Sequence, residues 1–132
     1  MENQTIKELT SFIKNSPTAF HAVKSIREIL TKEGFQELKE SEKWNIEKGG
    51  KYYVTRNHSS ILAFKVGNQL DEYSFHVTAS HSDSPTFKIK ENPEIEVEKH
   101  YVKLNVEKYG GMLCAPWFDR PLSVAGSVII KD

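Results

Sequence analysis

The 132-residue sequence has few of the features that mark secreted, membrane-bound or nucleic-acid-binding proteins. Its single cysteine, Cys114, excludes an internal disulfide and is compatible with a reducing compartment. The 18 basic and 18 acidic residues cancel, so bulk charge provides no attraction for nucleic acid or an anionic membrane. No apolar run approaches the roughly 20 residues of a transmembrane helix, and Met1–Thr5 lacks the basic and apolar segments of a signal peptide. We therefore expect a soluble cytoplasmic protein with no nucleic-acid or membrane partner.

Two amphipathic helices are predicted near the N-terminus. Apolar residues recur at helical spacing over residues 6–15, and the pattern resumes after a Ser-Pro pair. Ser16 is expected to cap the second helix, because a serine hydroxyl can accept a hydrogen bond from an N–H of the first turn. Pro17 is expected at the first helical position, where a backbone N–H would have no partner within the helix. Gly34 is expected to end this helix.

Segments with strand character follow the helices. Residues 52–56 and 60–66 are rich in β-branched and aromatic residues, and Asn57 between them predicts a hairpin. Alternating patterns predict further strands over residues 74–80, 86–90, 94–98, 101–106 and 124–130. The predicted fold class is therefore α/β, with N-terminal helices packed on a mixed β-sheet and a β-rich part after it. Asn92–Pro93 is a natural junction between two modules, which gives predicted domains of residues 1–92 and 93–132.

The candidate chemistry lies at the end of the strand predicted over residues 74–80, where the sequence places His81 and Asp83. Residues two apart in an extended chain point to the same side, so the Asp83 carboxylate can reach one imidazole nitrogen of His81 while the other points outward. Metal-ligating histidines are commonly held in this way, because the carboxylate fixes the tautomer and the ring orientation. The alternative is a structural one, in which the two side chains cap a strand end and hydrogen-bond to each other at the surface.

Other polar residues have simpler interpretations. His21 lies beside the apolar stripe of the second helix and is expected to be a surface or packing residue. His76 and His100 have no partner at ligand spacing. Asp119 and Arg120 can form an ion pair beside a turn, or they can face a substrate or a neighbouring subunit.

Five separated segments together resemble, in order, the N-terminal part of aspartyl-aminopeptidase-like metallopeptidases of family M18. They are Ser16–Val23, Gly49–Asn57, His81–Pro85, Tyr109–Gly111 and Trp117–Gly126. The resemblance extends over nearly the whole chain, and five ordered matches are far more specific than any one of them.

The resemblance implies a di-zinc exopeptidase that removes an N-terminal residue, often an acidic one, from peptide substrates. Such enzymes have a catalytic domain of the zinc-exopeptidase type, interrupted by a β-rich insertion domain used for homo-oligomer assembly. Residues 1–92 would then be the first portion of the catalytic domain and residues 93–132 the start of the insertion. By residue match, His81 would be a zinc ligand and Asp83 the catalytic-site residue that orients it.

The remaining parts of a two-zinc site are not found in the sequence. In the family, the bridging carboxylate, the further ligands and the glutamate base lie in the second half of a considerably longer chain, and catalytic zinc ordinarily takes three protein ligands. We therefore expect these 132 residues to be a fragment that is inactive in isolation, and the sequence identifies no substrate-binding residues. An incomplete sheet would expose strand edges and favour self-association. The alternative function is a non-catalytic, β-rich module for self-association or protein binding.

Overall fold

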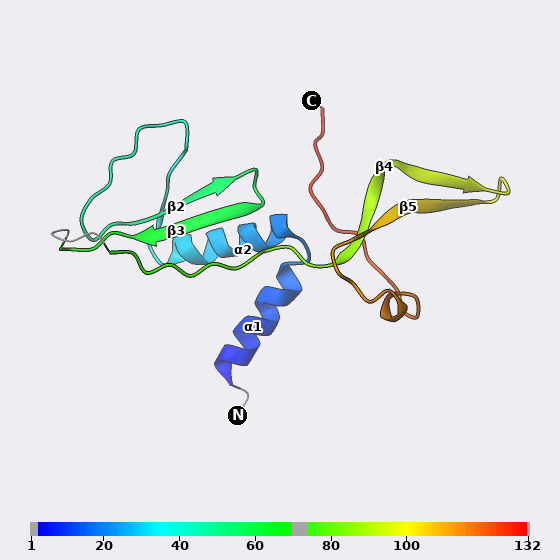
Figure 1. Cartoon of the computed structure of the whole chain (residues 1–132), viewed down its shortest axis with the longest axis horizontal. Coiled ribbons are helices and arrows are strands. Elements are labelled where there is room, and N and C mark those ends of the chain that lie inside the picture. Colours follow the sequence, from blue (N-terminus) through cyan, green and yellow to red (C-terminus); the bar gives the residue numbers. More distant parts are fainter. Residues whose placement is uncertain (1–2, 70–73, 132) are drawn as a thin grey trace. The chain divides into compact units, whose positions relative to one another are not determined.

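The computed structural model describes residues 3–69 and 74–131, and the chain divides into two compact units (Figure 1). The first unit consists of Met1–Ser82 and Ala125–Asp132, and the second of Asp83–Val124. Within the described ranges, no helix has the length and apolar character needed to cross a membrane.

The first unit begins with two helices, α1 (Gln4–Asn15) and α2 (Ala19–Lys32). Both predicted helices are confirmed, and Gly34 follows α2 in the left-handed conformation, with φ of 80°. The predicted cap of α2 is wrong by two residues. Thr18 is the N-cap, because its backbone is extended and its hydroxyl accepts a hydrogen bond from the N–H of His21. Ser16 instead contacts the hydroxyl of Ser25, at 3.3 Å between the Oγ atoms.

The sheet of the first unit has three strands, β1 (Gln36–Glu37), β2 (Lys51–Arg56) and β3 (Ser60–Lys65), in that order. β1 runs parallel to β2, and β2 pairs antiparallel with β3, so the predicted mixed sheet and hairpin are confirmed. Asn57 and His58 form the hairpin turn with φ of 52° and 55°. Two positive φ angles in succession are the backbone of the tight turns that match strand twist.

Both faces of β2 are covered. Tyr52 and Tyr53 are each 4% exposed, and neighbouring residues of a strand point to opposite faces. Tyr53 faces α2, because its hydroxyl lies 3.4 Å from that of Thr31. Val23 of α2 is 1% exposed, and Figure 1 shows α2 lying along the sheet. On the other face, the Tyr52 hydroxyl accepts a hydrogen bond from the N–H of Glu47 at 3.0 Å. The irregular segment between β1 and β2 therefore covers the face that α2 leaves open.

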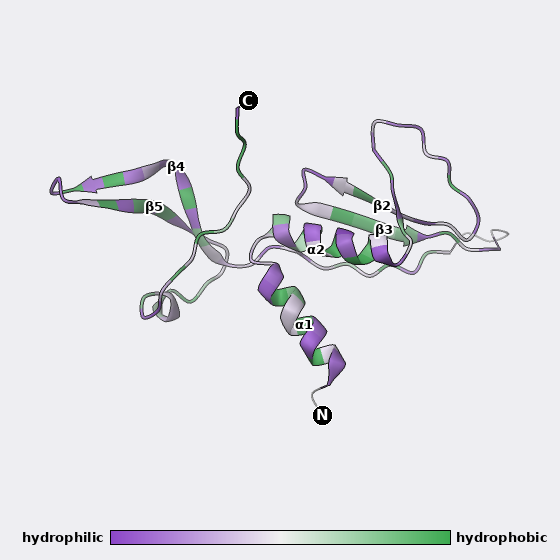
Figure 2. Cartoon of the chain, turned by 180° about the vertical axis from the view of Figure 1, so that it is seen from behind, coloured by the Kyte–Doolittle hydropathy of each residue, from purple (hydrophilic) through white to green (hydrophobic). Residues whose placement is uncertain are grey.

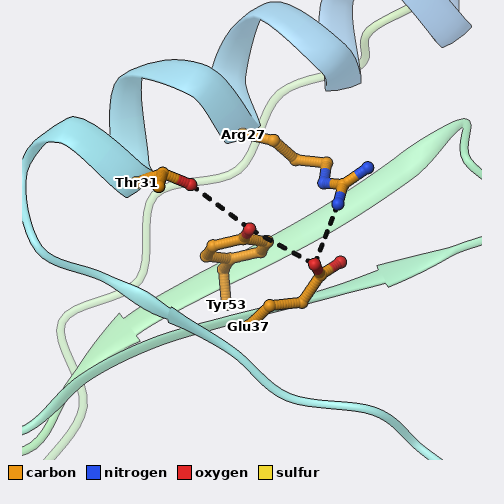
Figure 3. A network of polar contacts seen from close by, with 4 residues as sticks. All are labelled: Arg27, Thr31, Glu37 and Tyr53. Carbon is orange, nitrogen blue, oxygen red and sulfur yellow. Dashed lines mark hydrogen bonds and ion pairs between the residues drawn. The ribbon is translucent and has the colours of Figure 1, made fainter.

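A polar network joins α2 to the sheet at its edge (Figure 3). Arg27 donates to Glu37 of β1 at 2.8 Å, and the Tyr53 hydroxyl donates to the same carboxylate oxygen at 3.5 Å. Thr31, one turn along α2, lies 3.4 Å from the Tyr53 hydroxyl. The network orients the helix on the short strand β1.

The strands predicted over residues 74–80 and 124–130 are wrong. Both segments lack regular secondary structure, and their apolar side chains are exposed, with Phe75 at 84%, Val77 at 82% and Val128 at 85%. A strand forms only where a neighbour pairs with its N–H and C=O groups, and no strand among residues 3–69 and 74–131 pairs with either segment.

The second unit contains an antiparallel ribbon of β4 (Thr86–Val97) and β5 (Tyr101–Tyr109). Figure 2 shows polar and apolar residues alternating along both strands. The segments predicted as separate strands over residues 86–90 and 94–98 form one strand, with a register shift between Ile89 and Glu94. Pro93 lies in this shifted part, where the ladder is interrupted and a residue without an N–H is tolerated.

After β5, the chain folds back on the ribbon through a short 3-10 helix, η1 (Ala115–Trp117). The Phe87 ring of β4 contacts Trp117 edge to face at 5.7 Å and Phe118 at 6.0 Å between ring centroids. Met112 is 7% exposed, so the second unit has a small apolar core of its own.

The compact units divide between Ser82 and Asp83, whereas the predicted domain junction, Asn92–Pro93, lies within β4. The assignment of residues 1–92 to a catalytic domain and of residues 93–132 to an insertion domain stays a prediction.

Candidate functional site

The predicted pair is divided between the two compact units, His81 belonging to the first and Asp83 to the second. His81 is exposed near the end of the first unit, and Asp83 is the first residue of the second unit and is partly buried. Between them, the Ser82 hydroxyl donates to the backbone carbonyl of Ser59 in the β2–β3 turn at 3.2 Å. This bond fastens the end of the segment that carries His81 to the hairpin.

Asp83 has a defined partner within the second unit. The hydroxyl of Tyr109, the last residue of β5, donates to Oδ2 of Asp83 at 2.5 Å. This length is typical of a charge-assisted bond to a carboxylate, which is about twice as strong as a neutral one. The bond, together with the negative charge of Asp83, raises the pKa of Tyr109 above its usual value. Thr86, three residues after Asp83, pairs antiparallel with Tyr109, so Asp83 and Tyr109 lie at the same end of the ribbon.

A second contact brings the same two segments together. Gly110 has φ of 73°, and a Cβ atom on this residue would lie 3.5 Å from Cα of Pro85. The left-handed turn after β5 therefore packs against the Ser-Pro break that follows Asp83. The segments His81–Pro85 and Tyr109–Gly111 were separate matches in the sequence, and the contacts of Asp83 and Pro85 join them.

Tyr109 is the residue near the candidate site that sequence reasoning missed. Its only signal in the sequence was its place before two glycines in one of the matched segments. Spacing could not identify it, because it lies 26 residues after Asp83 and the contact depends on the register of β4 with β5.

The donor types of the pair suit zinc, since imidazole nitrogen and carboxylate oxygen are both common ligands. The described residues nevertheless contain no group of three His, Cys, Asp or Glu side chains that could hold a metal ion. They therefore do not fit a complete zinc site by themselves, and we derive no catalytic step through a metal. The roles predicted for His81 and Asp83 stay predictions.

The other polar candidates have local contacts. The Nδ1 atom of His21 lies 2.8 Å from the Thr18 hydroxyl, so His21 contacts the N-cap residue of α2. The Nε atom of Arg120 lies 3.5 Å from Oδ1 of Asp119, and both side chains are mostly exposed. Cys114 is partly buried.

Surface hollows with volumes of about 240 and 460 Å³ lie elsewhere among the described residues. The larger is lined by residues of α2 and β2, namely Lys24, Arg27, Glu28, Thr31, Lys32 and Tyr53. Its charges are mixed, so it indicates no substrate class.

Comparison with known sequences supports one family. The profile of the Aminopeptidase I zinc metalloprotease (M18) family matches residues 12–132. A "Probable M18 family aminopeptidase 2" of Clostridium novyi is 59% identical over 125 residues, which are 94% of this chain and 29% of the relative. A protein of the same description from Clostridium acetobutylicum is 47% identical over 131 residues, 98% of this chain and 30% of the relative. The chain thus spans about 30% of the length of these relatives.

Solved structures are also similar to this chain. Ape4, in a structure of its complex with Nbr1, superposes with a TM-score of 0.79 and 42% identity, over 83% of this chain and 21% of that one. The mApe1 dodecamer of S. cerevisiae superposes with a TM-score of 0.75 and 31% identity, over 89% of this chain and 28% of that one. The profile match covers most of the sequence, including the His81–Pro85 segment, and the chain belongs to the M18 family of zinc aminopeptidases.

Proposed function

We propose that these 132 residues are the N-terminal part of a cytoplasmic di-zinc aminopeptidase that removes acidic N-terminal residues from peptides. In this proposal His81 supplies one zinc ligand and Asp83 orients it. The observation that carries the proposal is the family match over residues 12–132, which includes both residues. The acidic preference is supported by the likeness of the matched segments to aspartyl-aminopeptidase-like enzymes.

The proposed roles follow from the chemistry of the two side chains. One imidazole nitrogen of His81 would be the metal ligand, and the other would donate to Asp83. The Asp83 carboxylate would fix that tautomer and raise the basicity of the ligating nitrogen. A completed two-zinc site would supply Lewis-acid chemistry at the scissile carbonyl.

We further propose that the 132 residues are inactive in isolation. Catalytic zinc ordinarily takes three protein ligands, and the part of the chain that the structure describes does not group three candidate ligands. The missing ligands and the proton-transferring carboxylate would come from residues outside the 132.

The test is a chimera in which this chain replaces the matching segment of the Clostridium novyi relative. Zinc content and cleavage of substrates with N-terminal Asp, Glu or Leu are measured for the chimera and for the 132 residues alone. We expect about two zinc ions in the chimera and faster cleavage of the acidic substrates, with neither zinc nor turnover in the short chain. Tight zinc binding and turnover by the short chain would refute the proposed incomplete site, and faster Leu cleavage would refute the acidic preference.

The role of His81 is tested in the same chimera with His81→Ala. Loss of a direct ligand should lower activity about 100-fold or more, since even residues that only orient ligands contribute about 10- to 100-fold. The matched control is His76→Ala, in the same exposed segment, which should leave zinc content and activity unchanged. Equal behaviour of the two variants would exclude His81 as a ligand.

A homo-oligomer is the proposed state of the complete enzyme. One face of β5 presents the apolar side chains of Val102, Leu104 and Val106, which are 69%, 52% and 38% exposed. The mApe1 relative was solved as a dodecamer. The exposed row also supports the alternative function, a non-catalytic module that self-associates. A stable oligomer of the 132 residues, indifferent to zinc, together with an inactive chimera would favour that alternative.

A further inference from the structure

We propose that Tyr109 is a positioning residue for the aminopeptidase site, which holds the Asp83 carboxylate in the orientation that His81 requires. The inference rests on the proposed function, in which Asp83 orients His81. It is carried by the bond from the Tyr109 hydroxyl to Oδ2 of Asp83 and by the packing of Gly110 on Pro85.

A single bond from Tyr109 does not use the full acceptor capacity of the Asp83 carboxylate. An ionised carboxylate has two oxygens and about four acceptor positions, so one bond from a tyrosine hydroxyl on Oδ2 is compatible with another from an imidazole N–H. The short bond also restricts rotation of the carboxylate about its side-chain axis. Tyr109 would thus select the orientation of Asp83 without touching metal or substrate itself.

Tyr109 is suited to this task because its own position is fixed. It ends β5 in register with Thr86, three residues after Asp83. The next residue, Gly110, packs on Pro85, two residues after Asp83. The end of β5 is therefore held against the segment after Asp83 by two contacts, the pairing of Tyr109 with Thr86 and the packing of Gly110 on Pro85.

A purely structural role is the competing explanation, in which the bond only fastens the end of the ribbon. The two roles differ in the effect of removing the hydroxyl. A fastening role affects stability alone, whereas a positioning role lowers the turnover of the folded enzyme and weakens its hold on zinc, and the loss depends on Asp83.

The experiment uses the chimera with Tyr109→Phe, which removes one oxygen atom from a residue that is 41% exposed. We expect kcat to fall about 10-fold with KM little changed, and zinc to be lost to a competing chelator about 10-fold more readily, at the lower end of the range for residues that orient ligands. Rates are measured well below the melting temperature, per folded molecule. The control is Tyr101→Phe at the other end of β5, where the side chain is 66% exposed and neither kcat nor zinc retention should change.

A double-mutant cycle with Asp83→Ala tests whether Tyr109 acts through Asp83. The double variant should be no slower than Asp83→Ala alone. The inference is overturned if Tyr109→Phe matches the unsubstituted chimera, if its loss is the same in the Asp83→Ala background, or if Tyr101→Phe gives an equal loss.

The same variants separate this inference from the proposed function. If His81→Ala and Asp83→Ala inactivate the chimera while Tyr109→Phe does not, only the role of Tyr109 is wrong. If His81→Ala and Asp83→Ala leave activity and zinc content intact, the proposed site is wrong and the positioning role is refuted with it.

Discussion

Arg27 of α2 and Glu37 of β1 form an ion pair in which the guanidinium Nη2 lies 2.8 Å from the carboxylate Oε2. The two side chains are 37% and 36% exposed, and the buried Tyr53 hydroxyl donates to the same oxygen. The pair gives the two-residue strand β1 a second connection to the unit, in addition to its backbone pairing with β2.

Glu37→Gln should lower the free energy of unfolding of the first unit by about 1 kcal/mol, because it removes the negative charge of the carboxylate to which Arg27 and Tyr53 both donate. The measurement is urea unfolding followed by the fluorescence of Trp44 in a Trp117→Phe background. Glu42→Gln is the control, since the Lys39–Glu42 ion pair is 71% and 61% exposed and should contribute less than about 0.5 kcal/mol. Equal effects of the two substitutions would show that the network does not stabilise the unit.

Val23 is the more deeply buried of the two buried residues of α2, with 1% of its surface exposed. Val23→Ala removes two buried methyl groups and should lower the free energy of unfolding by about 2 kcal/mol, from the lost transfer energy and the cavity that remains. Val77→Ala makes the same chemical change where the side chain is 82% exposed, and its effect should be close to zero. Comparable losses would mean that residues 74–80 are covered in solution.

The raised pKa of Tyr109 gives a pH dependence with a definite sign. The hydrogen bond to Asp83 and the carboxylate charge favour the protonated phenol in the folded state. The contribution to stability is therefore fully present below the usual tyrosine pKa, about 10, and is lost as the pH rises through the raised value. Asp83→Asn should lower the pKa of Tyr109 toward the usual value.

The measurement is an alkaline titration of tyrosinate absorbance, with Tyr109→Phe identifying the contribution of this residue. Asp119→Asn is the control, because Asp119 pairs with Arg120 and should leave the titration unchanged. An unchanged Tyr109 titration in the Asp83→Asn variant would show that the bond is absent in solution.

The features that could be predicted from the sequence are local. Both helices and the β2–β3 hairpin follow from periodicity and from Asn57, over segments of fewer than about 20 residues. The strand over residues 74–80 was wrong for a physical reason. Alternation at Phe75 and Val77 is a property of the segment alone, whereas a strand also requires a neighbour with which to pair.

The candidate site illustrates the same limit. The sequence suggested His81 and Asp83 because they are two residues apart, but the Tyr109 contact needs the pairing of β4 with β5 across a turn at Glu98 and Lys99. β1 was also missed, since two residues carry no periodicity and its pairing with β2 is parallel and non-local.

The turn after Tyr109 provides the last prediction. Gly110 has φ of 73°, a conformation that costs a residue with a side chain about 1 kcal/mol, whereas no atom lies within 4 Å of a Cβ placed on Gly111. Gly110→Ala should therefore lower the free energy of unfolding of the second unit by about 1 kcal/mol, and Gly111→Ala should change it by less than about 0.5 kcal/mol. Urea unfolding followed by Trp117 fluorescence in a Trp44→Phe background measures both values. Because relief of the strain would move the end of β5 away from Pro85, Gly110→Ala should also weaken the Tyr109–Asp83 bond and lower the pKa of Tyr109. A destabilised variant with an unchanged Tyr109 titration would show that the turn does not set the position of the hydroxyl.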